Sequence, residues 1–367
     1  MDSLTQGLLG AVTSQLGFRQ RIGRDAGWVA AAVAVAPDLD VLLGPLRSFS
    51  GAEVGEMAVT NYHRGLSHSL LMTPLIAAAA AGIWWWARRR AGNRRRPAQP
   101  DGAAETPAGR PPPFALLYAC CFVAALSHPL LDWCTSYGTQ LLAPITNTRY
   151  AIDALPIIDM FYTPMLIVTL LACYLVRKLK ANPRRATLIA GWAGFAISTG
   201  YIIAGAGLNW SLRRAAAGAL GNCKTRAYPQ LLTIFVWRVT AEDEQAWYVA
   251  RHNVLFSPPL TAERFTRAAK VDNQWVRRAR RLAEAKTYRW FSSGQTREAY
   301  SRSDGLHVVE FHDMRYGALL ESPQSMWPLR VTFDGGGSVA DVSRRHRHGP
   351  RDLGKLARQV WRDNWSP

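Results

Sequence analysis

The chain of 367 residues lacks the signatures of several common protein classes. Its five cysteines are an odd number without a CxxC pair, so they indicate neither a complete disulfide framework nor a cysteine metal site. A GxSxG elbow, a Walker loop and a GxGxxG turn after a strand are absent. The start, Met1-Asp2-Ser3, has no basic region of a cleaved signal peptide, so we expect export to depend on uncleaved apolar segments. Composition also excludes collagen, coiled coil and wholesale disorder.

Acidic residues are scarce. The chain has 26 Asp and Glu and 44 Lys and Arg, which gives a net charge of +18. Nucleic-acid-binding proteins often carry such an excess, but no DNA- or RNA-binding motif accompanies it here. The basic residues instead form short runs beside apolar segments, which is the positive-inside pattern of membrane proteins. We therefore expect no nucleic acid as a partner. These runs are Arg88–Arg90, Arg94–Arg96, Arg177–Lys178 and Arg184–Arg185.

Nearly all long apolar runs lie in the first part of the chain, although the mean hydropathy of −0.07 resembles that of a soluble protein. A helix needs about 20 apolar residues to cross a bilayer core. The sequence predicts an all-α, membrane-embedded helical bundle of about four or five spans, followed by a smaller mixed α+β soluble domain. The apolar segments are 4–17 (amphipathic or partly inserted), 28–46, 66–87, 114–131, 164–176 (spanning only if it begins near 161) and 186–208.

The basic residues also predict the orientation of these segments. Residues 88–113, a predicted flexible loop, carry seven Arg against two acidic residues, and 177–185 carry five basic residues and no acidic one. Both are expected in the cytoplasm. The connections 47–65 and 132–163, and everything after about 209, are then expected on the outer, periplasmic face. Cys134 and Cys223 would share that face, and whether they pair stays open.

The predicted division of the chain is therefore a membrane domain over 1–209 and a soluble domain over 210–367. The second domain alternates strand-like runs rich in Val, Ile, Phe and Trp with one helical pattern. We expect strands at 231–239, 246–256, 305–311 and 329–333, and a helix at 261–282.

Ionisable residues inside or beside apolar segments are the informative positions, because a charge there costs several kcal/mol. His128 and Asp132 are four residues apart and share one helix face, which suits two ligands of one ion, or a ligand and its hydrogen-bonding partner. Imidazole with carboxylate suits zinc or a similar divalent ion. Taken singly, each cluster also fits a structural role, as a helix break, an N-cap or a satisfied interfacial histidine. The candidate ligands are Asp38, Asp40, His63, His68, His128, Asp132, Asp153 and Asp159.

Six motifs follow one another over about residues 1–205: Met1–Gln6, Pro37–Asp40, His63–Ser69, Ser127–Asp132, Thr135–Leu142 and Asp153–Asp159. Through them the chain resembles the bacterial inner-membrane metal-dependent hydrolases of the YdjM type. The resemblance implies a helical membrane protein distantly similar to zinc-dependent phospholipase C and the related single-strand nucleases. Those relatives cleave phosphoesters with zinc ions held by His and Asp.

The resemblance implies roles for single residues. It makes Asp38, Asp40, His63, His68, His128 and Asp132 metal ligands, with Asp153 and Asp159 as further candidates. The relatives also use their N-terminal residue as a ligand, a role that we do not assign to Met1. Arg64 and Asp132 are the expected catalytic residues, with Arg64 neutralising charge on a phosphoryl oxygen. Alternatively, Arg64 faces lipid phosphates.

The expected function is metal-assisted hydrolysis of a phosphoester in a membrane lipid or lipid-linked substrate, with zinc as the expected ion. A bound divalent ion lowers the pKa of its water from about 15.7 towards about 7. The alternative is a protein without hydrolytic activity: an ion transporter, a metal sensor or a scaffold. Transport calls for discontinuous helices and polar residues through the depth of the membrane. The clearest such break is Pro37-Asp38.

Overall fold

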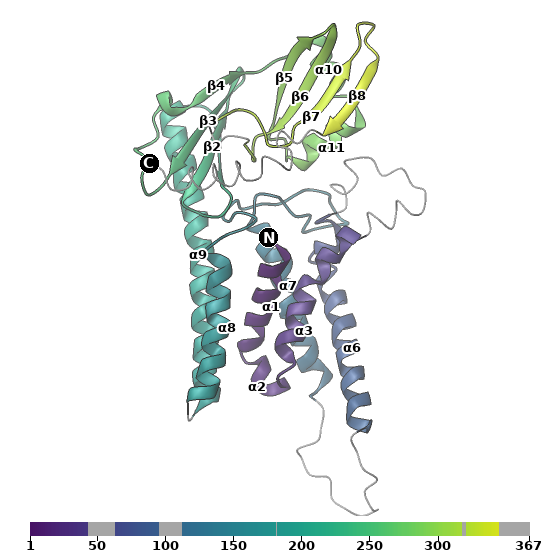
Figure 1. Cartoon of the computed structure of the whole chain (residues 1–367), viewed down its shortest axis with the longest axis vertical. Coiled ribbons are helices and arrows are strands. Elements are labelled where there is room, and N and C mark those ends of the chain that lie inside the picture. Colours follow the sequence, from purple (N-terminus) through teal and green to yellow (C-terminus); the bar gives the residue numbers. More distant parts are fainter. Residues whose placement is uncertain (43–62, 95–111, 181, 318–320, 345–367) are drawn as a thin grey trace, which may run out of the picture.

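A computed structural model of the protein describes residues 1–42, 63–94, 112–180, 182–317 and 321–344. The first part is helical and the second contains two antiparallel sheets, which lie beyond one end of the helices (Figure 1). The N-terminus lies at the same end of the helices as the sheets (Figure 1). The coarse prediction of helices followed by a mixed α+β part is therefore confirmed.

Two short helices open the chain. α1 (Ser3–Gln15) and α3 (Ala26–Val35) are joined by α2 (Phe18–Ile22) and pack tightly, since a Cβ on Gly10 would lie 2.5 Å from the carbonyl oxygen of Ala30. α3 runs directly into the 3-10 helix η1 (Ala36–Leu42). Pro37 lacks the N–H that an α-helix would need here, so the predicted apolar segment is broken where Asp38 follows.

Three helices are long and apolar enough to span a membrane: α7 (Phe114–Trp133), α8 (Tyr162–Leu179) and α9 (Pro183–Leu220). The described residues thus contain fewer candidate spans than the four or five predicted. One that is missing is α6 (Thr73–Arg94), whose apolar part ends at Ala87, short of the about 20 residues a bilayer core requires. The predicted apolar segment 28–46 is not a span either, because α3 ends at Val35. It begins later than predicted, because Leu66–His68 form a separate 3-10 helix, η2.

Residues 88–94, predicted as loop, are the last turns of α6, while 95–111 lie outside the described residues. α9 continues to Leu220, so the predicted domain boundary at 209 falls inside a helix. α8 and α9 pack closely, because a Cβ on Gly194 would lie 2.1 Å from Thr169 Oγ1. The side chain of Asn209 then ties α9 to the first sheet by donating to Ala227 O at 2.7 Å.

Each sheet has four antiparallel strands in chain order. The first contains β1 (Lys224–Pro229), β2 (Val236–Glu242), β3 (Ala246–Asn253) and β4 (Thr266–Ala269), with Val239 opposite Ala250. The second contains β5 (Thr296–Ser303), β6 (Leu306–Asp313), β7 (Leu329–Phe333) and β8 (Val339–Arg344), with Val309 opposite Val331. Strands β2, β3, β6 and β7 correspond to the four predicted strands.

The single helix predicted over 261–282 is wrong. That stretch holds the 3-10 helix η4 (Ala262–Arg264), then β4, then α10 (Gln274–Ala279), and α11 (Ala283–Phe291) follows. α10 begins at Gln274 because the Asn273 side chain accepts from Val276 N at 2.9 Å and caps the helix. All five cysteines are free, so Cys134 and Cys223 are unpaired in the structure.

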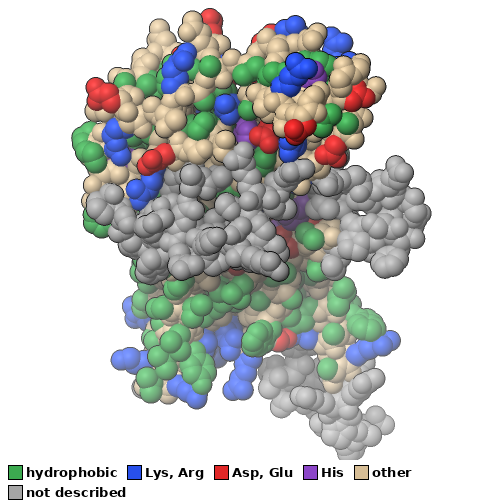
Figure 2. All heavy atoms as spheres, turned by 45° about the horizontal axis from the view of Figure 1, so that its top comes forward, with side chains coloured by type: hydrophobic (Ala, Val, Ile, Leu, Met, Phe, Trp, Pro, Cys, Tyr) green, Lys and Arg blue, Asp and Glu red, His purple; other side chains and the backbone are tan. Residues whose placement is uncertain are grey.

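One hydrophobic core runs from the helices into the first sheet, where Leu131 and Tyr162 belong to the same buried cluster as Trp237 and Val239. A second core joins α10 and α11 to the second sheet. Figure 2 shows hydrophobic side chains over the helical part and Lys and Arg gathered at its far end, away from the sheets. α6 and α8 end there with Arg88–Arg90 and Arg177–Lys178, and α9 begins there with Arg184–Arg185.

Candidate metal centre

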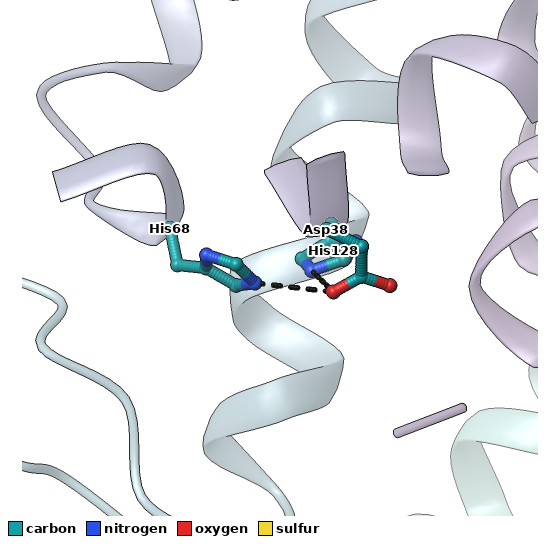
Figure 3. A group of neighbouring side chains, drawn as sticks. All are labelled: Asp38, His68 and His128. Atoms are coloured by element: carbon teal, nitrogen blue, oxygen red, sulfur yellow. Dashed lines mark hydrogen bonds and ion pairs between the residues drawn. The ribbon is translucent and has the colours of Figure 1, made fainter. Parts of the chain in front are cut away.

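Three elements bring six of the eight predicted ligands together at the sheet end of the helices. η1 contributes Asp38 and Asp40, the turn with η2 contributes His63 and His68, and α7 contributes the remaining pair. Figure 3 shows Asp38, His68 and His128 pointing toward one another from these three elements. Most of the group is shielded from solvent, since His68, His128 and Asp132 are fully buried.

Asp38, His68 and His128 lie close enough together to share one ion, and Asp132 adjoins them. Asp38 Oδ1 lies 3.3 Å from His68 Nε2 and 3.5 Å from His128 Nε2. Asp132 Oδ2 lies 3.6 Å and 3.5 Å from the same two nitrogens. Zinc binds His nitrogen and carboxylate oxygen at about 2.0–2.2 Å, and neighbouring ligands of a tetrahedral site are then about 3.4 Å apart. The four distances are in the range expected between ligands of one divalent ion, which Asp38, His68 and His128 would hold with Asp132 as a further oxygen donor.

Hydrogen bonds on the outer side of this group turn acceptor atoms inward. His128 Nδ1 lies 2.6 Å from Ala34 O, and because a carbonyl only accepts, Nδ1 carries the proton and Nε2 of the neutral ring keeps its lone pair. His128 Nε2 and Asp132 Oδ2 are buried and have no hydrogen-bond partner among the described residues. With a neutral His128 ring, these two facing atoms are both acceptors, and a cation bound between them would satisfy both.

The two inward carboxylates are each held by their other oxygen. Asp38 Oδ2 accepts from Ser3 Oγ at 2.6 Å. Asp132 Oδ1 accepts from Gln6 Nε2 at 3.1 Å and from the α-amino group of Met1 at 2.5 Å, and it forms an ion pair with Arg64 Nη2 at 3.1 Å. One oxygen of each carboxylate is thus anchored and the other is free to bind an ion.

Asp40 and His63 form an outer layer. Asp40 accepts from Ser67 Oγ at 2.7 Å and lies 2.9 Å from His63 Nδ1 and 3.3 Å from His68 Nδ1. Asp40, His63 and His68 also lie close enough to share an ion. A proton on His68 Nδ1 directed at Asp40 leaves His68 Nε2 as the inward ligand. Asp40 therefore fits an orienting role better than a place among the inner ligands.

The neighbouring imidazoles keep the outer carboxylates ionised. Burial alone would raise the pKa of Asp38, but the adjacent imidazoles of His128 and His68 hold it well below its usual range. Burial likewise opposes the ionised form of Asp40, and the hydrogen bonds from His63, His68 and Ser67 hold its pKa well below the usual range. Both groups are therefore charged at neutral pH, as metal-binding carboxylates must be.

Arg64 has a strained backbone and little contact with solvent. Its φ is 57°, in the left-handed region that non-glycine residues seldom adopt, and only 4% of it is exposed. Nη2 pairs with Asp132 and Nη1 donates to Thr135 Oγ1 at 2.9 Å, while the buried Nε has no partner among the described residues. This enclosed position does not fit the alternative in which Arg64 faces lipid phosphates.

Asp153 and Asp159 stand apart from the cluster, since among the described residues no hydrogen bond or ion pair joins either carboxylate to the six clustered side chains. Asp159 accepts from the backbone N–H groups of Phe161 and Tyr162, both at 2.8 Å, and from the Tyr201 hydroxyl, so it caps the start of α8. Asp153 is partly buried, and burial raises its pKa to about 6. The structure therefore gives both carboxylates surroundings other than the cluster.

The α-amino group of Met1 is the clearest member of the site that the sequence analysis did not assign. Met1 is buried, and its amino group donates to Asp132 Oδ1 at 2.5 Å. Asp2 fixes it there by capping α1, accepting from Thr5 N at 2.9 Å, and by donating its own N–H to Ile157 O. The opening motif Met1–Gln6, together with the N-terminal ligand of the distant relatives, was the signal that pointed to it.

The fold and the cluster define a class of protein. It is a helical protein with apolar helices of membrane-spanning length and, near one end of the helices, a group of His and Asp side chains able to hold a metal ion. Residues 1–210 match the family described as YdjM inner membrane protein, and the chain belongs to this family. No curated protein and no solved structure matches the chain at a significant level.

Proposed function

We propose that this protein is a membrane-bound, metal-dependent hydrolase that cleaves a phosphoester in a lipid or lipid-linked substrate. The observation that carries the proposal is the set of inward atoms of Asp38, His68, His128 and Asp132, two of which are buried acceptors without a hydrogen-bond partner. Zinc is the ion that this donor set suits best. When bound, such an ion supplies a Lewis acid and a water that deprotonates near neutral pH.

The protein residues around the ligands have separate tasks in this proposal. Asp132 holds the guanidinium of Arg64 beside the ligand group, and the unpartnered Nε of Arg64 is a donor for a phosphoryl oxygen on which charge develops. Asp40 orients His68, with Ser67 and His63 completing its hydrogen bonds. Burial of the cluster excludes bulk water and strengthens these interactions.

Metal content tests the proposal directly. Protein purified in mild detergent should contain stoichiometric zinc or another divalent ion and should hydrolyse members of a panel of phosphoesters that includes phospholipids. The double variant His68→Ala with His128→Ala should lose both. The matched control, His252→Ala with His307→Ala, removes two imidazoles from the sheets and should keep both. Full metal content in the first variant would refute the ligand assignment.

We further propose that the protein is a multi-pass protein of the bacterial inner membrane with the cluster and the sheets on the periplasmic side. Support comes from the basic residues Arg88–Arg90, Arg177–Lys178 and Arg184–Arg185, which lie at the end opposite the cluster. A reporter that is active only in the cytoplasm, fused after Pro367, should be inactive. An active reporter would reverse the orientation.

An apolar groove beside the cluster supports a substrate with a lipid chain. The cavity of about 930 Å³ lies between α1, α3 and α8, and its lining includes Ser3 and Leu39 at the cluster end and Arg177 at the other. Ser3 also donates to Asp38. From Ser3 to Gln15, α1 rises about 18 Å at 1.5 Å per residue. That length is close to half of the bilayer core of about 30 Å, the depth of one leaflet's acyl chains.

We therefore assign this groove to an acyl chain of the substrate. Ala32 lines it, so Ala32→Trp should fill it and lower hydrolysis of a long-chain phospholipid while leaving a water-soluble phosphoester unaffected. Ala79→Trp, at an exposed position of α6, is the matched control. Equal loss for both substrates in Ala32→Trp, or equal loss in both variants, would show that the groove does not hold the chain.

A further inference from the structure

Arg149, in the segment between α7 and α8, is a buried charge that the metal centre does not use. Only 7% of its surface is exposed. Its Nη2 donates to Gly138 O at 2.8 Å, whereas Nε and Nη1 are buried without a hydrogen-bond partner among the described residues. No carboxylate in the described part of the chain forms an ion pair with it. Buried charges are normally paired, so this guanidinium lacks an anion.

Aromatic side chains from both parts of the molecule hold the guanidinium in place. The ring centroids of Tyr137, Trp290 and Phe291 lie 5.1, 5.3 and 5.1 Å from its central carbon. Trp290 and Phe291 belong to α11, and Trp290 Nε1 donates to Asn147 O at 3.0 Å. The position of Arg149 is therefore built jointly by the helical part and by the part that carries the sheets.

The same aromatic ring links Arg149 to the metal cluster. The ring of Tyr137 lies 5.7 Å from that of His63 and 4.6 Å from the guanidinium carbon of Arg64. Burial, together with repulsion from Arg315 and Arg64, lowers the pKa of Arg149 to about 10, so it stays protonated at neutral pH. Arg64 and Arg315 each pair with an aspartate, which leaves Arg149 as the charge without a partner among these three.

We infer that Arg149 forms an anion subsite for a phosphate group, walled by Tyr137 and α11 and adjoining the metal cluster. Its two unpartnered nitrogens, Nε and Nη1, supply the donors, and a guanidinium matches phosphate oxygens in shape as well as charge. Identifying this phosphate as part of the substrate rests on the proposed function. The subsite also gives a role to the part of the chain that carries the sheets, because α11, which packs on the second sheet, forms one wall of it.

Phosphate titration by calorimetry tests the subsite on the full-length protein in detergent, after chelator treatment, so that no metal contributes. Wild type should bind inorganic phosphate, and Arg149→Gln should weaken binding by about 10- to 100-fold. Arg149→Lys keeps the charge without the planar fork and should lie between them. Arg89→Gln, which removes an arginine packed on Trp85 at the far end of α6, should bind like wild type.

Thermal unfolding separates this role from simple packing. Without phosphate, Arg149→Gln should be as stable as wild type or more so, because it removes an unpaired buried charge. With phosphate, only wild type should gain stability. Absence of phosphate binding by wild type, unchanged affinity in Arg149→Gln, or equal destabilisation with and without phosphate would each overturn the inference.

Nanodiscs containing phosphatidic acid identify the source of the phosphate. If they displace inorganic phosphate from wild type, the ligand is a lipid headgroup, and if they leave it bound, the ligand is free phosphate. Both results support the subsite. The binding measurement needs neither metal nor turnover, so failure of the proposed hydrolysis leaves it standing, and loss of the subsite leaves the metal test unaffected.

Discussion

Replacing Asp132 with asparagine removes one negative charge from the middle of the cluster with almost no change in volume. Asp132 Oδ1 is the shared acceptor for the Met1 amino group and for Arg64, which are 4% exposed each. Its Oδ2 faces both inward imidazoles. The substitution therefore perturbs two things at once: the balance of buried charge and the ligand set.

The magnitude of each effect follows from these contacts. Removing one partner of a buried ion pair costs about 3–5 kcal/mol, because the remaining charge stays buried without compensation. Loss of a carboxylate that ligates or orients a ligand costs about 10- to 100-fold in metal affinity or activity. We expect Asp132→Asn to lose both stability and metal affinity. Asp38→Asn should lose mainly metal affinity, because the Asp38 side chain is 15% exposed and pairs with no arginine among the described residues.

Metal analysis combined with thermal unfolding in detergent separates these effects. Asp313→Asn is the matched control, since Asp313 is fully buried and pairs with Arg315 at 2.7 Å outside the cluster. It should lower stability to a similar extent and leave the metal content unchanged. An Asp132→Asn protein with the stability and metal content of wild type would refute the reasoning. Equal metal loss in Asp313→Asn would attribute that loss to general destabilisation.

Three further outcomes are expected. A chelator should lower the thermal midpoint of wild type but not that of His68→Ala with His128→Ala, by an amount worth about 2.7 kcal/mol at an ion concentration of 100 times Kd. The raised pKa of Asp153 means that its contribution to stability is full below about pH 3.8 and lost as pH rises through about 6. Asp153→Asn should thus stabilise the protein by up to about 3 kcal/mol at pH 7 and little at pH 4, in unfolding curves at both values. Asp159→Asn should cost about 0.5–2 kcal/mol by weakening the cap of α8, with metal content unchanged in elemental analysis.

The cluster was predictable from the sequence because an ionisable side chain in or beside an apolar segment costs free energy and therefore stands out. Pro37-Asp38 breaks an apolar run, and the spacing of His128 and Asp132 places both on one helix face. The predicted orientation, which placed the connections 47–65 and 132–163 on one face, rested on counting apolar segments. The count was higher than the structure supports, but the ends of α7 and η1 still fall on the same side, because both run toward the sheets.

The surroundings of Asp153 and Asp159 could not be predicted from the sequence. A carboxylate beside an apolar segment looks the same in sequence whether it binds an ion or caps a helix, as Asp159 does for α8. Arg149 was not predicted, because its sequence surroundings do not mark it as unusual. It lies in polar sequence, and only the folded chain reveals that rings from residues about 140 positions away enclose it. Long-range burial of this kind leaves no local pattern.

The distribution of acidic residues favours surface chemistry over transport. In the described helical part, the inner ligands lie at the sheet end, and the carboxylate at the other end is Asp25, which pairs with Arg88. The buried polar residues described between them are neutral, such as Thr13, Gln15 and Thr169. A transporter of ions needs ionisable or coordinating groups along a path through the membrane. A cluster confined to one end, beside an apolar groove and an arginine without an anion, fits a substrate drawn from one leaflet and cleaved at its surface.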